Sequence, residues 1–212
     1  AAESAKTLTW RYCVRGENFQ GDDDAATDRI FLKELNEILQ DLTDVTLTVS
    51  PTDIGKQSTN PMRQARALNF TDRRELYLRG RVLHQEKWYS DKARWDATWS
   101  HRWLLVGIVF EFIGVVAAAA RAFGGLQIDL LGIFAAAAAT AIAWLQTKQF
   151  QNLATAYGIT AQELASVAAE VEAWNDEATW PQFMGQAEEA ISREHTLWRA
   201  SRGLRVGPPT RG

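Results

Sequence analysis

The most unusual chemical group in this sequence is the carboxylate of Glu111, which lies within a long run of apolar residues. Gly107 lies four residues before it and Gly114 three residues after it, so a helix would place all three on one side. An ionisable group in apolar surroundings is costly and indicates a function, whereas glycines let a second helix approach closely. We predict that Glu111 faces a bundle interior or water. Two interpretations remain open: Glu111 lines or gates a cation path, or it is protonated and makes one interhelical hydrogen bond.

A second apolar run carries Thr140 in a series of small residues. Gly132, Ala136, Thr140 and Ala143 recur at intervals of three or four, which places them on one face of a helix. We expect this face to match the glycines of the first run. Thr140 is therefore a second candidate for an interhelical or pore-lining role.

Residues that could carry out catalysis are few and form no recognisable arrangement. His84 and Glu86 imitate the start of a zinc-deaminase signature, but that chemistry needs later cysteines, and the only cysteine is Cys13. Glu194 and His195 would point about 100° apart on a helix, so they are not a ready acid–base pair. The sequence has no phosphate-binding loop, nucleophile elbow or His-Glu-x-x-His motif. We predict a protein that is not an enzyme, with no catalytic residue, metal site or cofactor.

The charge balance argues against nucleic acid as a partner. The formal net charge is -3 over 212 residues, whereas phosphate backbones attract clustered Lys and Arg. The single cysteine also excludes an intramolecular disulfide or a multi-cysteine metal site.

The elements that must position these residues are helices throughout, so we predict an all-α fold. Helices are expected over 1–12, 28–42, 60–68, 71–123, 130–174 and from about 179 onward, separated by a polar loop at 16–24 and an extended connector at 46–49. The helix over 71–123 is unusually long, because no proline or glycine cluster interrupts it.

Two of these helices contain apolar stretches long enough to cross a bilayer. The first covers about 103–123 and rises roughly 31 Å, close to the bilayer core of about 30 Å. Gly124 and Gly125 then break the helix, and the second stretch, at about 129–145, must return. We predict a long-helix antiparallel hairpin with two transmembrane helices and a cytoplasmic helical bundle.

Tryptophans mark one end of both apolar stretches. Trp95, Trp99 and Trp103 recur at intervals of four residues, and Trp144 lies where the second stretch ends. Indole rings anchor helices at the membrane–water interface. We therefore predict that Trp99, Trp103 and Trp144 are interface anchors and that the lipid bilayer is a partner.

Basic residues indicate the orientation of the hairpin. Lys92, Arg94, Arg102 and Lys148 flank its outer ends, whereas the turn holds only Arg121. The positive-inside rule then places both ends in the cytoplasm.

A soluble helical bundle with the hairpin as its core is the competing fold. Three charges favour it: Glu111 within the first stretch, Arg121 near its end and Asp129 just before the second.

Opposite charges gather on the two segments that flank the hairpin. Residues 63–102 contain ten Lys or Arg and five Asp or Glu, whereas residues 150–194 contain eight acidic residues and one Arg. Antiparallel pairing would neutralise both segments. A solvated bundle of mixed charge is an equally simple interpretation, because exposed ion pairs contribute little.

A family resemblance rests on the helix before the hairpin and on residues 144–148 at the exit of the second apolar stretch. The most specific positions on that helix are Arg81, Gln85, Trp88 and Tyr89. Over roughly 71–202 the chain resembles the SLATT family, the SMODS- and SLOG-associating two-transmembrane effector domains of prokaryotic conflict systems.

The resemblance implies an effector in the cell inner membrane that is kept inactive until a nucleotide-signalling or sensor protein activates it. It is then thought to disrupt the membrane, by pore formation. A homo-oligomer is expected, because one hairpin cannot enclose a channel. The competing function is a membrane-anchored scaffold that recruits a partner and transports nothing.

Three segments follow from this interpretation. Residues 1–55 form an N-terminal helical segment that resembles the tail of a preceding module, residues 56–202 form the effector domain, and residues 203–212 form a disordered tail. Because the first residue is Ala1, we expect the sequence to be the C-terminal part of a longer polypeptide.

Overall fold

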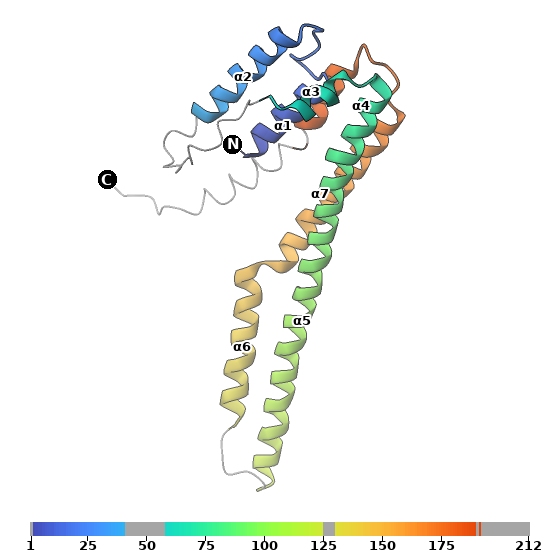
Figure 1. Ribbon diagram of the computed structural model, residues 1–212. Coiled ribbons are helices and arrows are strands. Elements are labelled where there is room, and N and C mark those ends of the chain that lie inside the picture. The colour runs from blue at the N-terminus through green and yellow to red at the C-terminus, as the bar shows by residue number, and fades with distance from the viewer. Residues whose placement is uncertain (1, 41–57, 125–129, 190, 192–212) are drawn as a thin grey trace, which may run out of the picture. The chain divides into compact units, whose positions relative to one another are not determined.

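The computed structural model describes residues 2–40, 58–124, 130–189 and 191. These residues contain helices and no strand, which confirms the predicted fold class. The predicted connector at 46–49 and the predicted tail at 203–212 lie outside the described residues. The helices are α1 (Ala2–Cys13), α2 (Asp24–Gln40), α3 (Asn60–Ala67), α4 (Phe70–Tyr77), the π-helical turn η2 (Leu78–Val82), α5 (Leu83–Ala122), α6 (Leu130–Lys148) and α7 (Phe150–Ala173) (Figure 1), and a further helix covers 180–189.

The chain divides into two compact units, each described below by itself. The head consists of Ala1–His84 and Leu164–Gly212, and the hairpin unit consists of Gln85–Glu163.

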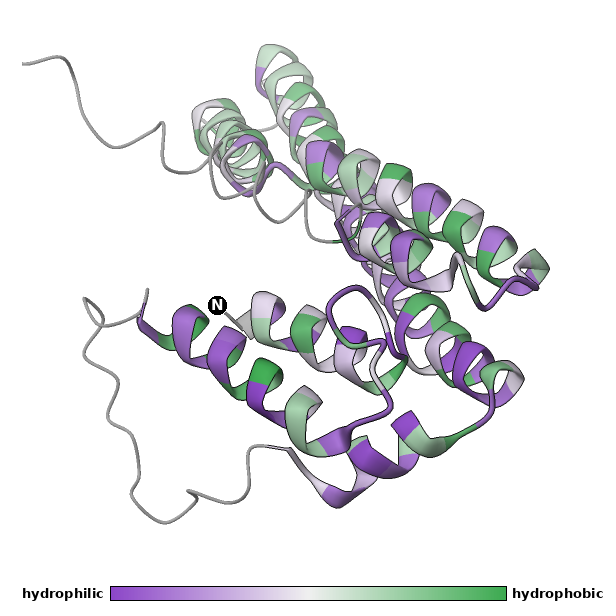
Figure 2. Ribbon diagram, turned by 90° about the horizontal axis from the view of Figure 1, so that it is seen from above, coloured by the Kyte–Doolittle hydropathy of each residue, from purple (hydrophilic) through white to green (hydrophobic). Residues whose placement is uncertain are grey.

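The core of the head is built from residues far apart in the sequence. Its helices carry hydrophobic residues on one side and hydrophilic residues on the other (Figure 2), as expected for helices around a core. The ring centroids of Tyr12 and Phe31 lie 5.0 Å apart, and those of Tyr77 and Trp180 lie 6.1 Å apart. The largest apolar side chains buried in this core are Tyr12, Phe19, Phe31, Tyr77, Trp180 and Met184. Helices α1 and α2 therefore share one core with the helix at 180–189.

Arg66 fixes the loop between α1 and α2. Its side chain is 1% exposed, and its guanidinium donates hydrogen bonds to the carbonyl oxygens of Phe19, at 2.6 Å, and Gly21. A third bond, of 3.3 Å, goes to the Thr27 hydroxyl. Backbone carbonyls of a loop need such donors when they are buried, so this side chain replaces water inside the head.

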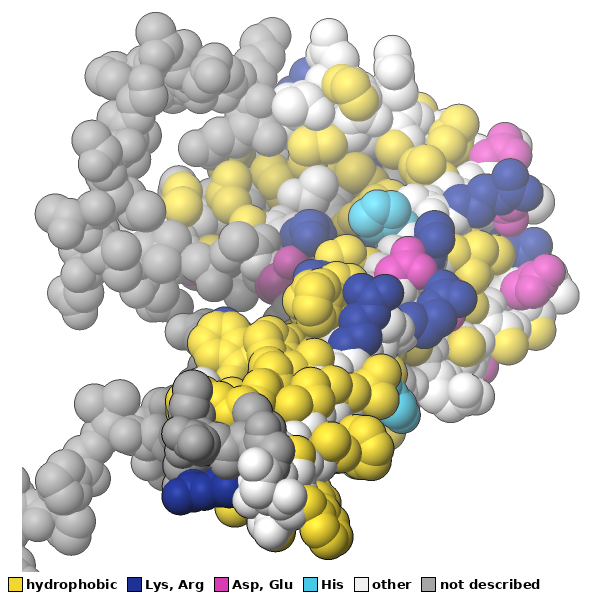
Figure 3. Space-filling model, turned by 90° about the horizontal axis from the view of Figure 1, so that it is seen from below, with side chains coloured by type: hydrophobic (Ala, Val, Ile, Leu, Met, Phe, Trp, Pro, Cys, Tyr) yellow, Lys and Arg dark blue, Asp and Glu magenta, His cyan; other side chains and the backbone are white. Residues whose placement is uncertain are grey.

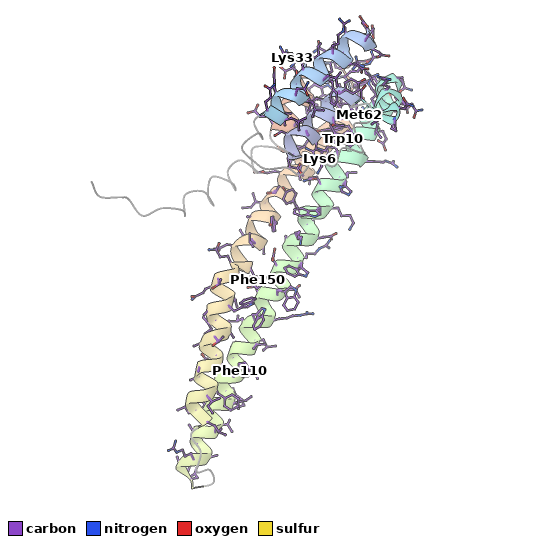
Figure 4. All side chains as sticks on the ribbon, turned by 60° about the vertical axis from the view of Figure 1, so that its left-hand side comes forward. Lys6, Trp10, Lys33, Met62, Phe110 and Phe150 are labelled. Atoms are coloured by element: carbon purple, nitrogen blue, oxygen red, sulfur yellow. The ribbon has the colours of Figure 1, made fainter. Side chains whose placement is uncertain are left out.

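The long helix predicted over 71–123 is confirmed as a helical run over Phe70–Ala122, with one local irregularity. The turn Leu78–Val82 is π-helical, and the Leu83 N–H bonds the carbonyl of Leu78. Gly80 lies in this turn beneath the indole of Trp10, which Figure 4 labels. A Cβ atom at position 80 would lie 2.6 Å from Trp10 Cη2, so glycine allows α1 to approach this turn.

The helix predicted to continue from residue 130 to about 174 is in fact two helices. Helix α6 ends at Lys148 and α7 begins at Phe150. Gln149 lies between them and has a φ of 53°. This is a left-handed backbone conformation that residues other than glycine rarely adopt. No glycine or proline marks this position, so the sequence carried no signal for the break.

Candidate functional site

Helices α5 and α6 run antiparallel, side by side (Figures 1 and 4). They meet along a narrow line of small residues, which we call the seam. A Cβ atom on Gly114 would lie 3.3 Å from Phe134 Cβ, and one on Gly107 would lie 3.8 Å from Ile142 Cγ1. Both glycines thus face α6 of the same chain. The buried residues of the seam are Gly107, Gly114 and Ala117 on α5 and Ala138 and Ala141 on α6.

The rest of the hairpin surface is apolar and exposed. Only 11% of the most apolar window of either helix is buried, whereas the core helix of a soluble protein would be mostly buried. Figure 3 looks at the hairpin from the side of its turn and shows hydrophobic side chains spread over its surface. Among the most exposed are Leu104, Leu105, Phe112, Val115 and Ile133. Both helices are long and apolar enough to cross a membrane, and a bilayer would cover this surface.

Glu111 lies on this exposed surface, beside the seam rather than in it. Its neighbours Phe112 and Val115 are 68% and 62% exposed. With the residues that the structure describes, Glu111 makes no hydrogen bond or ion pair. It lies eight residues after Trp103, about 12 Å along the helix. In a membrane this carboxylate would face lipid, water or another chain, and not α6 of its own chain.

Thr140 is exposed and donates a hydrogen bond of 2.8 Å to the Ala136 carbonyl. It lines an apolar groove of about 470 Å³ between α5 and α6, together with Phe110, which Figure 4 labels. The small face of α6 does not meet the glycines of α5 within this chain, and its match to those glycines between chains stays a prediction. Gly132, Ala136, Thr140 and Ala143 are all exposed, because α6 turns Ala138 and Ala141 toward α5 instead.

Tryptophans and basic side chains form a belt at one end of the hairpin, defined by Trp95, Trp99, Trp103 and Trp144. The rings of Trp103 and Trp144 lie 6.1 Å apart and so join α5 to α6. The Lys148 ammonium lies 4.7 Å from the centre of the Trp144 ring, and the Arg102 guanidinium lies 5.4 Å from that of Trp99. Indole rings paired with cations suit the boundary between water and lipid. Their anchoring role stays a prediction.

In the head, the predicted family position Arg81 belongs to a buried polar network. Its Nε and one Nη donate to the two carboxylate oxygens of Glu188 at 3.1 and 2.9 Å. The hydroxyl groups of Tyr77 and Thr7 donate to the same carboxylate at 2.9 and 2.8 Å. Glu3 adds a weaker ion pair, 3.7 Å from the guanidinium.

Burial and charge set the ionisation of this network. Burial alone would lower the pKa of Arg81, but hydrogen bonds and attraction to Glu188 raise it overall. Burial, followed by the Glu188 charge, raises the pKa of Tyr77 well above its ordinary value, so the phenol remains a donor. The carboxylate therefore has donors on both oxygens and is shielded from solvent. Such a pair can position helices but cannot exchange a proton with a substrate.

The remaining family positions lie in the hairpin unit. Tyr89 is 4% exposed and packs 5.8 Å from the Tyr157 ring, Trp88 lies 6.0 Å from the same ring, and Gln85 is half-buried. Arg81 and these three positions therefore do not form a single site.

Sequence reasoning missed Glu188, the partner of Arg81. The sequence feature that could have indicated such a pair was the opposite net charge of residues 63–102 and 150–194. Within the head this charge pattern appears as the Arg81–Glu188 pair and as a second pair between Arg73 and Glu177, 2.5 Å apart. Among the described residues, His, Cys, Asp and Glu do not gather in a group of three that could hold a metal ion.

The fold and the exposed apolar hairpin define an all-helical protein of the two-transmembrane class. Residues 77–198 match the family described as SMODS and SLOG-associating 2TM effector domain 1, and residues 1–74 match SMODS and SLOG-associating 2TM effector domain 3. Because the first match spans more than half of the chain, the protein belongs to the SLATT family of two-transmembrane effector domains, as predicted. No curated protein and no solved structure matches the chain.

Proposed function

We propose that this protein is a membrane effector of a prokaryotic defence system, in which several hairpins assemble and disrupt the inner membrane by forming a pore. Membership of the effector-domain family supports the effector role. The observation that supports pore formation is the exposure of Glu111 on the apolar surface of the hairpin.

A charged side chain that faces lipid near the bilayer centre costs roughly 3 kcal/mol. The seam cannot remove this cost, because small residues of α6 already cover that face of α5. A second hairpin placed against the Glu111 side would remove it, and a ring of hairpins would let the carboxylates face water. Glu111 then lines a path that favours cations, because carboxylates attract them.

The orientation belongs to the same proposal. Arg102 and Lys148 lie at the belt, where positive charges favour the cytoplasmic side, so both ends of the hairpin face the cytoplasm. The head would then receive a signal from a nucleotide-signalling or sensor protein.

Release of dye and potassium from liposomes tests the pore. The full chain, Glu111→Gln, Glu163→Gln and a variant lacking residues 103–145 are reconstituted at equal density. Glu163 is an exposed acid on α7 outside the apolar stretches, so its variant is the matched control. We expect release by the wild type and by Glu163→Gln, reduced cation release by Glu111→Gln, and none without the hairpin. Membrane depolarisation in bacteria that produce each variant provides the cellular measurement.

If Glu111→Gln released dye and potassium as the wild type does, Glu111 would not line the ion path. Stable insertion without release or depolarisation, also when the signalling partner is present, would instead favour the membrane-anchored scaffold.

A further inference from the structure

The hairpin has two flanks, one on each side of the seam, and Phe110 and Glu111 mark one flank each. A helix turns about 100° per residue, so these neighbours point in different directions at nearly the same depth. Gly107 and Gly114 lie between them around the helix, and both glycines face α6. Phe110 therefore lies on one flank of the contact between α5 and α6, and Glu111 lies on the opposite flank.

The flank that Phe110 marks carries the apolar groove described above. Its lining residues are Trp103, Phe110, Ala137, Thr140, Ala141 and Trp144. Thr140 supplies the only hydroxyl group among them. This hydroxyl donates to the Ala136 carbonyl, so its oxygen lone pairs are available to accept a further bond. An apolar surface with a hydroxyl group is a combination that recurs where helices pack in membranes.

The opposite flank carries the complementary group, the exposed carboxyl of Glu111. Glu111 follows Phe110, which lines the groove, so both surfaces lie at the same depth in the bilayer. Helical side chains lean toward the N-terminus of their helix, which directs the carboxyl of Glu111 toward the belt and the level of Thr140. The Thr140 hydroxyl accepts from a protonated carboxyl, or donates to an ionised one in place of its bond to Ala136.

We propose that hairpins assemble head to tail, with the Glu111 flank of one copy seated in the Thr140 groove of the next. This contact rests on the proposed assembly of several hairpins, and it specifies the two surfaces that meet. Each copy has one surface of each kind, so the contact is heterologous and can repeat. Because all copies have the same orientation in the bilayer, the repeat turns about the membrane normal and a ring can close. One carboxyl oxygen of Glu111 then binds Thr140, which leaves the other for the ion path.

Disulfide cross-linking between full chains in liposomes tests this contact. Two variants in a Cys13→Ser background, Glu111→Cys and Ala137→Cys, carry tags of different size, are reconstituted together and are oxidised. Each chain has a single cysteine, so every disulfide joins two chains, and the mixed dimer is recognised by its mass. Ala137 lines the groove one turn deeper than Thr140, close to the depth of Phe110. We expect mixed dimers to form in severalfold excess over those of the control pair.

The control pair is Phe112→Cys with Ala137→Cys. Phe112 is adjacent to Glu111 and is 68% exposed, but it points about 100° away around the helix. It therefore reports random collisions between hairpins at the same depth.

A second pair retains both polar groups. Val115 lies one turn deeper than Glu111 on the same side of α5, and Ile133 lies two turns deeper than Thr140 on the same side of α6. Both side chains are 62% exposed. Val115→Cys and Ile133→Cys chains should also give mixed dimers. Adding Thr140→Val to the Ile133→Cys chain removes the hydroxyl but keeps the shape, and it should lower the yield about threefold, the effect of a typical interhelical hydrogen bond in a membrane.

Equal yields from the Glu111→Cys and Phe112→Cys chains would overturn the contact, and so would a yield that Thr140→Val leaves unchanged. The pore and the contact can fail separately. Selective mixed dimers in liposomes that release nothing would support the contact without a pore. Release without selective mixed dimers would support the pore and overturn the contact.

Discussion

Arg81 and Glu188 form a bidentate ion pair inside the head, although they lie 107 positions apart in the sequence. Their side chains are 2% and 1% exposed, and the donor–acceptor distances are 3.1 and 2.9 Å. Because Arg81 lies on η2 and Glu188 on the helix at 180–189, the pair holds together two parts of the head that no local contact could join.

Removing one partner of this pair should destabilise the head strongly. In Glu188→Ala a buried guanidinium loses its carboxylate, which costs about 3–5 kcal/mol. The combined variant Arg81→Met with Glu188→Leu should lose less, because no unpaired charge remains. Arg79→Ala, at an exposed ion pair with Glu75, should change stability by about 0.5 kcal/mol or less.

Labelling of the single cysteine measures these differences. Cys13 is buried, and burial raises the pKa of its thiol to about 11, so it reacts with maleimides only when the head opens. Faster labelling of Arg79→Ala than of Glu188→Ala would contradict the importance given to the buried pair.

Protonation of Asp28 should lower the stability of the head at low pH. Burial alone would raise the pKa of Asp28, but hydrogen bonds from Tyr12, Arg63 and Ser58 lower it overall. Its folded-state pKa is therefore below the unfolded value of about 3.9. The stabilisation is complete above that pH and is lost as the pH falls through the folded-state pKa.

Asp28→Asn should consequently lose about 1.5–3 kcal/mol at pH 7, the range for hydrogen bonds to charged groups. The difference in free energy of unfolding between the wild type and Asp28→Asn should narrow below about pH 4. Urea unfolding at several pH values measures this difference. Asp22→Asn is the control, because the Asp22 side chain is 91% exposed, and it should have little effect on stability. If the difference between the wild type and Asp28→Asn stayed constant down to pH 2, the link between Asp28 and pH-dependent stability would be disproved.

Two glycine substitutions should have opposite effects. Gly80→Ala places a Cβ atom 2.6 Å from the Trp10 ring, which also packs against Tyr77, so we expect a loss of about 1–3 kcal/mol. At Gly158, in the interior of α7, an added Cβ meets nothing within 4 Å, so Gly158→Ala should gain about 0.5–1 kcal/mol from helix propensity. Thermal unfolding in detergent compares the two, and a neutral Gly80→Ala would mean that the indole moves without cost.

The two glycines of the seam should differ in tolerance. Gly114 has Phe134 at 3.3 Å and Leu131 at 3.5 Å from an added Cβ, whereas Gly107 has only an ordinary contact at 3.8 Å. We expect Gly107→Ala to be nearly neutral and Gly114→Val to push α5 and α6 apart. Disulfide formation between cysteines placed on the two helices, in a Cys13→Ser background, reports their separation. Equal yields in all variants would show that the seam is not closely packed.

The sequence predicted the helices and the hairpin because these depend on local periodicity and on the length of apolar runs. Trp144 and Lys148 were recognisable for the same reason. The Arg81–Glu188 pair could not be predicted, since it depends on tertiary contacts between distant segments. The orientation of α6 about its own axis, which leaves Thr140 exposed, could not be predicted either. It depends on which face of small residues packs best against α5, and an alanine-rich helix has several similar faces.

The break between α6 and α7 at Gln149 has a consequence for how the hairpin would fit a bilayer. Helix α6 has 19 residues and rises about 28 Å, slightly less than a typical hydrocarbon thickness. Because the helical run is interrupted at a single residue after Lys148, we expect α6 to adjust its tilt to a thinner or thicker bilayer without bending α7. Gln149→Pro or Gln149→Gly should then change the range of bilayer thickness that the hairpin tolerates.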